Sequence, residues 1–327
     1  MPTTRWPPAG FRESMLRAVL AAVLFWAMSA QAFPTRPVRL IVPFPPGGAT
    51  DIIGRLVAAR MQAVWGQSVI VDNRPGAGTV VGTDAVAKSA PDGHTLGMVV
   101  TAHVINPSLR RNLPYDTLTD LAAVSHVSVQ HLVIATHPAV EAANLAELIA
   151  LAKRNPGRLS YATPGSGTAM HLSVELLKAE AGIDIVHVPY KGGAPAQQDV
   201  MGGRVPILLD VLYAVQPLIN AGKIRPIALL SPQRIAGSSI PVVAETVPGV
   251  SALSIVGIVA AAATPRDLVR KISSDLSKAI QGSDLTDRMV QLGMEPVGST
   301  PEQFDALIRA EIDKWARVVK ASGAKVD

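Results

Sequence analysis

The sequence predicts an α/β protein of two lobes joined by two crossing strands. Apolar, β-branched runs alternate with segments of helical periodicity along the chain. This succession of strand, helix and strand favours parallel sheets with right-handed crossovers. Two long apolar strands, near residues 126–136 and 254–261, bracket a segment with strands and helices of its own. The chain therefore leaves one lobe and returns to it, so we expect residues 33–133 and 253–327 to form lobe 1 and residues 134–252 to form lobe 2.

The elements of lobe 1 follow from periodicity and from helix-start signals. Ile53, Leu56 and Val57 recur at helical spacing, and the last helix opens with Thr300-Pro301. The expected strands are Val38–Val42, Val69–Val71, Thr95–Val100 and Ser254–Ala261, and the expected helices are Asp51–Val64, Val80–Lys88, Arg266–Gln281, Leu285–Gln291 and Pro301–Ala321.

Lobe 2 shows the same alternation and completes a second sheet. It is entered through the strand His126–Thr136, and the segment Pro241–Gly249 is rich in turns. The other expected strands are Arg158–Ala162, Ile185–Val188, Val205–Asp210 and Ile224–Leu230, and the expected helices are Leu145–Arg154, Thr168–Ala181, Pro195–Met201 and Val215–Ala221.

Composition excludes several classes of function. The chain has 327 residues, a formal net charge of +5, seven histidines and no cysteine. Without cysteine there are no disulfides, no thiolate–metal sites and no lipid anchor. The charge is too small for a nucleic-acid binder, and no basic run with interleaved aromatics occurs. The histidines show no metal-binding spacing and no nucleotide fingerprint is present, so we expect neither a metal nor a cofactor.

The N-terminal segment reads as a signal peptide. Arg5, Arg12 and Arg17 precede a short apolar run at Ala18–Met28, and Ala30-Gln31-Ala32 follows it. We expect cleavage after Ala32, export and a mature protein that begins at Phe33. Either Met1 or Met15 can be the start of translation.

The segment between the first strand and the first helix is the leading candidate site. Phe44, Pro45 and Pro46 precede Gly47 and Gly48, and the helix then starts at Thr50-Asp51. The glycines bring bare N–H groups close to the strand end, and the helix directs its unpaired first-turn N–H groups to the same place. That arrangement suits a carboxylate or a phosphate. The alternative is an ordinary turn with a Thr/Asp cap.

A second segment of the same kind lies in lobe 2. After the strand that ends near Ala162, Ser166, Gly167 and Thr168 precede a helix, and their hydroxyl and N–H groups are candidate donors to an anion. His171 either lines the cleft or caps the helix. Ser166 lacks the G-x-S-x-G context of a hydrolase nucleophile, because position 164 is Pro and position 168 is Thr. We therefore expect no catalytic residue.

Two further candidates stand at strand ends of lobe 2. Lys191 and Gly192 follow the strand Ile185–Val188, and Asp210 ends the strand Val205–Asp210. The carboxyl ends of strands are where open α/β sheets bind ligands. The alternatives are a solvated lysine in a surface loop and a helix cap for Asp210.

With these segments in view, the chain from Phe33 to Asp327 resembles the periplasmic solute-binding proteins of tripartite tricarboxylate transporters, the Bug family. The matching blocks are Pro37–Gly48 with Asp51, Asn73–Gly78, Ala90–Gly93, Asn106–Leu109, Leu113–Asp116, Gly165–Thr168 with His171, and His187–Gly192, to which the C-terminal part adds Pro241, Glu245, Thr264-Pro265 and Glu295–Gly298. Two departures from the family pattern are Ile255-Val256 before Gly257, where an aromatic pair is common, and Pro164 in the second loop.

The resemblance implies a type II-like periplasmic binding protein, a two-lobed Venus flytrap that closes on a small carboxylated solute. The loop from Phe44 to Asp51, with Gly47, Gly48 and Thr50, would hold one end of the solute, while Asp51 stabilises its own loop. Ser166, Gly167 and Thr168 would hold the other end, with Lys191, Gly192 and Asp210 on the far wall. The implied partners are a small organic anion and the membrane permease subunits of the transporter, and we expect a monomer. A sensor that presents its solute to a signalling ectodomain and a secreted hydrolase acting through Ser166 and His171 are the alternatives.

Overall fold

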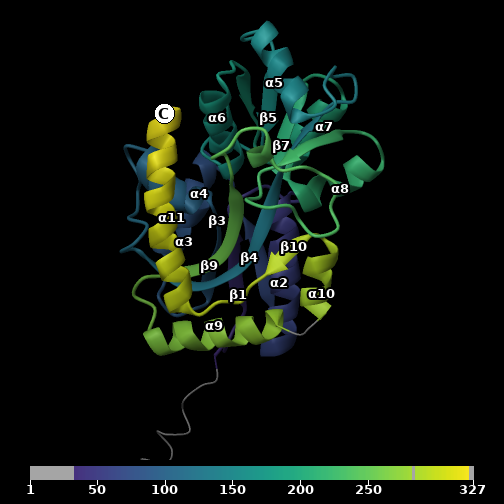
Figure 1. The fold of residues 1–327 in the computed structure, drawn as a ribbon. Coiled ribbons are helices and arrows are strands. Elements are labelled where there is room, and N and C mark those ends of the chain that lie inside the picture. Colours follow the sequence, from purple (N-terminus) through teal and green to yellow (C-terminus); the bar gives the residue numbers. More distant parts are fainter. Residues whose placement is uncertain (1–32, 282–283, 324–327) are drawn as a thin grey trace, which may run out of the picture.

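One mixed sheet of ten strands runs through the molecule, which is a computed structural model describing residues 33–281 and 284–323 (Figure 1). The predicted signal peptide at residues 1–32 lies outside the described residues. The strand order is β2-β1-β3-β9-β4-β7-β5-β6, and β8 and β10 also pair with β4. The strands are β1 (Val38–Val42), β2 (Val69–Asn73), β3 (Thr95–Val100), β4 (Leu121–Thr136), β5 (Ser160–Thr163), β6 (Val186–Pro189), β7 (Ile207–Val211), β8 (Arg225–Leu229), β9 (Leu253–Ala261) and β10 (Met294–Pro296).

The helices cover the two halves of this sheet. Figure 1 shows α5, α6 and α7 around β5 and β7 in the upper half, and α2, α9 and α10 around the lower half. The helices are α2 (Ala49–Trp65), α3 (Val80–Ala87), α4 (Ala102–Leu109), α5 (Leu145–Arg154), α6 (Ala169–Ala181), α7 (Gly193–Met201), α8 (Leu212–Asn220), α9 (Arg266–Ile280), α10 (Asp284–Gln291) and α11 (Pro301–Ser322). Two short 3-10 turns lie at Ala77–Thr79 and Val243–Glu245.

Strand β4 crosses from one half of the molecule to the other. Its residues 121–131 pair antiparallel with β9, and its residues 132–136 pair antiparallel with β7 and β8. The two lobes therefore share one continuous sheet through β4. The sequence analysis had instead suggested a separate sheet in each lobe. Both faces of this strand are covered, and its last five residues, 132–136, are apolar except for Thr136.

Strand β9 begins at the crossing point. It pairs with β3 and with the first part of β4, and Leu253 lies opposite His131. Just before it, the Ala252 N–H donates to the Leu230 carbonyl at 2.7 Å, which ties the returning chain to the end of β8. The predicted return path is thus present, but β9 itself pairs only within the half that contains β1 to β3.

Helix α4 is a feature that the sequence analysis did not predict. It follows β3 directly and contains Pro107 in its interior. Pro normally ends or kinks a helix, so the segment Ala102–Leu109 carries a breaker signal. Burial stabilises it, because Ala102, Val104 and Ile105 have no exposed surface and α4 packs against α11.

Five helices that follow strands have their N-terminal ends at the boundary between the halves. The pairs are β1 with α2, β3 with α4, β5 with α6, β6 with α7 and β7 with α8. The first two pairs lie in the lower half and the other three in the upper half. This arrangement directs helix N-termini from both halves toward the boundary where β4 crosses. In the described part of the chain, no helix combines the length and the apolar character needed to cross a membrane.

Candidate functional site

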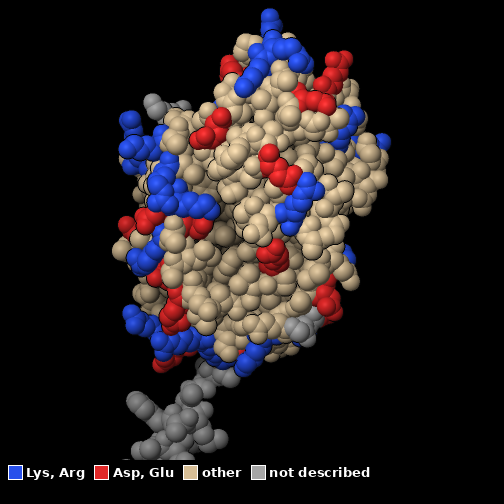
Figure 2. Space-filling model, in the orientation of Figure 1, with Lys and Arg blue, Asp and Glu red and all other residues tan. Residues whose placement is uncertain are grey.

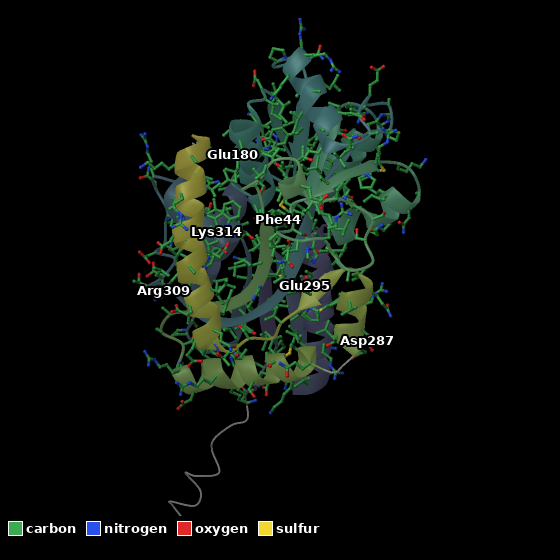
Figure 3. All side chains as sticks on the ribbon, viewed as in Figure 1. Phe44, Glu180, Asp287, Glu295, Arg309 and Lys314 are labelled. Carbon is green, nitrogen blue, oxygen red and sulfur yellow. The ribbon has the colours of Figure 1, made fainter. Side chains whose placement is uncertain are left out.

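A small, partly open cavity lies at the boundary between the two halves. We call it the inner cavity; its volume is about 40 Å³, and its walls are formed by Phe44, Pro45, Gly48, Ala49, Thr50, Val100, Thr101, Ala102, Gln130, Pro164, Thr168, Ala169, Met170, Gly192, Gly193, Asp210, Val211 and Ser254. Figure 3 places Phe44 at the middle of the molecule, between the halves. A water molecule needs roughly 10–15 Å³ by the same measure. The inner cavity therefore has room for a small functional group rather than for a whole organic acid.

Helix N-termini converge on the inner cavity. Its wall includes residues of the first turn or cap of α2, α4, α6, α7 and α8. The first N–H groups of a helix have no partner within the helix, and each N-terminus carries about half a positive charge. The only residue of this wall with an ionisable side chain is the acidic Asp210. The positive potential therefore comes from backbone dipoles, which suits a carboxylate.

Gln130 adds a side-chain donor that the sequence analysis missed. It lies on β4 at the crossing, is 3% exposed, and lines the inner cavity. Its Nε2 is buried and makes no well-aligned hydrogen bond, although the Tyr213 hydroxyl lies close enough to the Gln130 side chain to interact with it. A buried unpaired donor costs about 1–3 kcal/mol, so an acceptor on a bound ligand would remove that penalty. In the sequence, Gln130 is one of several polar residues inside a long strand, and no local pattern distinguishes it as a ligand-binding residue.

Asp210, which the sequence left open between a helix cap and a hydrogen-bond acceptor for a ligand, lies in the wall of the inner cavity. The carboxylate accepts from Gln197 Nε2 and from the Val211 N–H, each at 2.8 Å. Burial raises the pKa of the Asp210 carboxyl to about 6, although these two hydrogen bonds oppose the shift. A protonated Asp210 can donate to a bound anion, whereas the ionised form would repel it.

The loop after β1 is braced by Asp51. Its carboxylate accepts from the Gly47 N–H at 2.9 Å, from Arg55 Nε at 2.8 Å and from Asn73 Nδ2 at 2.9 Å. Burial alone would raise the pKa of Asp51, but the hydrogen bonds from Arg55, Gly47 and Asn73 outweigh burial and lower it. Asn73 Nδ2 also donates to the Phe44 carbonyl at 2.9 Å. Asp51 thus stabilises its own loop, as the sequence analysis stated.

Only part of this loop faces the inner cavity. Phe44, Gly48 and Thr50 line it, whereas Pro46 and Gly47 are exposed and do not. The Gly47 N–H, a predicted donor to the anion, is occupied by Asp51 instead. At Gly48 the backbone is extended, with φ −83°, and an added Cβ would meet only the Pro45 carbonyl oxygen at 3.7 Å.

The loop after β5 uses its side chains mainly for its own structure. The Thr168 hydroxyl donates to the Gly165 carbonyl at 2.8 Å and accepts from the His171 N–H at 3.3 Å, so it caps α6. The hydroxyl is therefore occupied, although Thr168 does line the inner cavity. Ala169 and Met170, the first two residues of α6, also line the inner cavity, and their backbone provides first-turn N–H groups to it.

His171 faces away from the inner cavity. Its ring stacks on His187 with centroids 4.0 Å apart, and its Nδ1 accepts from the Gly167 N–H at 3.3 Å. His187 in turn hydrogen bonds to Thr163 Oγ1 at 2.7 Å. Neither Gly167 nor His171 is part of the cavity wall. In this structure the histidine supports the loop through its contacts with Gly167 and His187, and its contact with a ligand stays a prediction.

A larger cavity adjoins the inner one. We call it the outer cavity; its volume is about 660 Å³, and it shares Phe44, Pro45, Pro164 and Thr168 with the inner cavity. Its other walls are Pro43, Pro75, Gly76, Ala77, Gly78, Thr79, Arg110, Gly165, Ser166, Tyr190 and Lys191. Ser166 and Lys191 thus lie around the outer cavity, while Gly192 lies at the inner one, where its N–H donates to the Pro164 carbonyl at 2.9 Å.

The two halves touch around both cavities. An added Cβ on Gly78 would lie 2.9 Å from the Ser166 carbonyl oxygen, and one on Gly192 would lie 3.4 Å from Pro45 Cδ. Over the face shown in Figure 2, acidic and basic side chains are interspersed. Among residues 33–281 and 284–323, no group of three or more acidic or histidine side chains is arranged to hold a metal ion.

Comparison with known proteins identifies the family. The sequence profile described as "Tripartite tricarboxylate transporter family receptor" matches residues 53–324. The chain belongs to this family. Among curated relatives of this receptor, Protein BugT of Bordetella pertussis is 37% identical over 303 residues, covering 91% of this chain and 93% of BugT. The predicted resemblance to the Bug family is confirmed.

Solved structures of similar receptors have the same fold. An R. palustris protein solved with adipate has a TM-score of 0.86 and 36% identity, covering 90% of this chain and 100% of that protein. MatC from Rhodopseudomonas palustris, solved with bound malate, has a TM-score of 0.83 and 29% identity, covering 88% of this chain and 100% of MatC. The predicted two-lobed flytrap fold is thereby confirmed.

Proposed function

We propose that this receptor binds a small carboxylated organic solute between its lobes in the periplasm and delivers it to the permease subunits of a tripartite tricarboxylate-type transporter. The observation that carries the proposal is the inner cavity, where helix N-termini from both halves surround the buried Gln130 amide. Membership in the receptor family supports the transport role and the periplasmic location. The relatives solved with adipate and with malate support a carboxylate as the bound group.

In this proposal one carboxylate of the solute occupies the inner cavity. The N–H groups of Ala49, Thr50, Ala169 and Met170 and the Gln130 amide donate to its oxygens. Gly48 and Gly192 leave room for it, and a protonated Asp210 completes the wall. Lobe 1 comprises residues 33–133 and 253–327, and lobe 2 comprises residues 134–252. The donors therefore come from both lobes of one chain. We take the protein to act as a monomer. The signal peptide is cleaved after Ala32.

The expected affinity fits a reversible receptor. Charge-assisted hydrogen bonds contribute roughly 1.5–3 kcal/mol each, and a helix terminus about 0.3–2 kcal/mol. A few such contacts reach about −8 kcal/mol, the value for a micromolar complex, after the cost of ordering the solute and the lobes. Lobe closure makes the liganded shape distinct, which gives the permease a difference to recognise.

The test is a solute screen of the mature protein, residues 33–327. Thermal shift identifies stabilising compounds among dicarboxylates, tricarboxylates, amino acids and aromatic acids, and calorimetry measures the affinity of each. We expect at least one carboxylate to bind with micromolar affinity and its amide or methyl ester not to bind. Binding of ester and acid with equal affinity would contradict the proposal, and turnover of the ester would favour the hydrolase alternative.

A further inference from the structure

The outer cavity contains an unusual pair of cations. Arg110 and Lys191 are the only residues of its wall with charged side chains, and no acidic residue belongs to that wall. Within residues 33–281 and 284–323, neither cation takes part in any of the ion pairs formed. Two other basic residues, Arg74 and Arg204, do pair with acidic side chains, namely Asp72 and Asp199.

Arg110 is held in place without being neutralised. Its Nε donates to Asn106 Oδ1 at 3.2 Å, and Asn106 Nδ2 donates in turn to the Gly78 carbonyl, also at 3.2 Å. Burial lowers the pKa of the Arg110 guanidinium, but an arginine remains charged in proteins. The guanidinium has five N–H donors, and the bond to Asn106 uses only the one on Nε. A partly buried cation without a carboxylate partner carries a desolvation cost that an anionic ligand would offset.

The chain makes room for this guanidinium with glycine. An added Cβ on Gly78, where φ is +60°, would lie 2.7 Å from Arg110 Nη2. An added Cβ on Gly167, in the loop of the other lobe, would lie 4.0 Å from the same nitrogen. The guanidinium therefore lies between the glycine turn of one lobe and the anion-binding loop of the other.

The two cations come from opposite sides of the cleft. Arg110 directly follows α4, beside β3, and Lys191 lies between β6 and α7. They line the same cavity only because the lobes meet. A ligand group that contacts both would thus add to the free energy of closure.

We propose that Arg110 and Lys191 form a second anion subsite, which selects solutes with a second anionic group remote from the carboxylate in the inner cavity. This inference rests on the proposed function, because it takes the inner cavity as the site of the first carboxylate. The inner cavity is too small for a whole solute, so the remainder passes Phe44 and Pro164 into the outer cavity. The fork of Arg110 suits a carboxylate, and Lys191 supplies a point charge.

The test compares acids of equal chain length that differ in the second charge. Adipate and hexanoate are the probes, and calorimetry measures both affinities for the mature wild-type protein, Arg110→Gln and Lys191→Gln. Arg111→Gln and Lys223→Gln are matched controls, since both residues are exposed. We expect wild type to prefer adipate by about tenfold or more, a ratio typical of a gained charge pair. Arg110→Gln should reduce that preference to near unity while hexanoate affinity is unchanged.

Each other outcome overturns the subsite. Equal affinities of the wild-type protein for adipate and hexanoate would overturn it. So would an equal loss of affinity for both acids in Arg110→Gln. A loss of the adipate preference in Arg111→Gln as large as that in Arg110→Gln would also overturn it. If the wild-type protein shows no preference for adipate but still binds carboxylates, the second subsite fails and the proposed function stands. If no carboxylate in the wider panel binds the wild-type protein, both fail.

Discussion

The phenol of Tyr213 donates a hydrogen bond to the carbonyl of Ala49 at 2.7 Å and thereby joins the first turns of two helices from opposite halves of the molecule. Tyr213 lies in the first turn of α8 and is 4% exposed, while Ala49 begins α2. Both helices contribute to the wall of the inner cavity. The bond therefore exists only when the halves are together at the site.

Tyr213→Phe tests whether this bond contributes to closure. Loss of one hydrogen bond between the lobes should reduce the free energy of closure by about 0.5–1.5 kcal/mol. We expect solute affinity to fall by roughly two- to tenfold, mainly through a faster koff, as measured by calorimetry and stopped-flow fluorescence. Tyr161→Phe is the control, because the Tyr161 hydroxyl bonds to Glu175 within one lobe and lies in neither cavity wall. Equal losses in both variants would contradict a specific role for Tyr213 in closure.

Gly48→Val should abolish binding while the fold is retained. The backbone at Gly48 is compatible with a side chain, and a Cβ has ordinary contacts there. The valine methyl groups would then occupy the space of the anion in the inner cavity. We expect an affinity loss of at least about a hundredfold by calorimetry, equivalent to the loss of two charge-assisted hydrogen bonds. Ala143→Val adds similar bulk at an exposed position and should bind normally. Unchanged affinity in Gly48→Val would remove this loop from the site.

Asp210 should make both stability and binding depend on pH. Its pKa is raised by burial to about 6 from an ordinary value of 3.8, so the folded state binds the proton more tightly than the unfolded state. The associated stability is fully present below about pH 4 and is lost as the pH rises through about 6. Two pKa units correspond to roughly 3 kcal/mol, taken as an order of magnitude.

Asp210→Asn should remove this dependence. We expect its unfolding free energy to exceed that of wild type near pH 7.5 and to be equal or lower near pH 4.5, as measured by urea denaturation. Solute affinity of wild type should weaken above about pH 6, because an ionised Asp210 repels the anion. The affinity of the variant should stay level over the same range. A parallel pH profile in the two proteins would show that another group is responsible.

The stacked pair His171 and His187 should act in the opposite direction. Burial lowers the pKa of His187 to about 3 and also lowers the pKa of His171. In the unfolded chain, histidine titrates near 6.5, so the unfolded state binds more protons below that pH. Stability is fully present above about pH 6.5 and declines as the pH falls toward about 3. Between pH 7 and pH 4.5, the unfolding free energy of His187→Gln, measured by urea denaturation, should fall less than that of wild type. A steeper fall in the variant would contradict the role given to the buried histidine.

The general fold could be predicted from sequence because the relevant signals are local. Strands such as Val38–Val42 and helices such as α9 have strong periodicity, and the strand-helix order fixes the architecture. Helix α4 was missed because Pro107 is a breaker whose effect tertiary packing overrides. The shared sheet was missed because pairing of β4 with β7 and β8 is a long-range event.

The candidate site was predictable in position but not in its individual donors. The glycine and helix-start signals indicated loops that line the two cavities, yet Gly47 and Thr168 use their polar groups within those loops. Gln130 and Arg110 carry no local signal, since their roles depend on what the opposite lobe brings near them. Contacts across a cleft are decided by tertiary structure, which periodicity does not describe.

The most direct test of the central claim is a crystal structure of the mature protein with its tightest-binding carboxylate. The account predicts carboxylate oxygens in the inner cavity, about 2.7–3.2 Å from the N–H groups of Thr50 and Ala169 and from Gln130 Nε2. A carboxylate bound elsewhere, with these donors turned to water or to other protein groups, would contradict it.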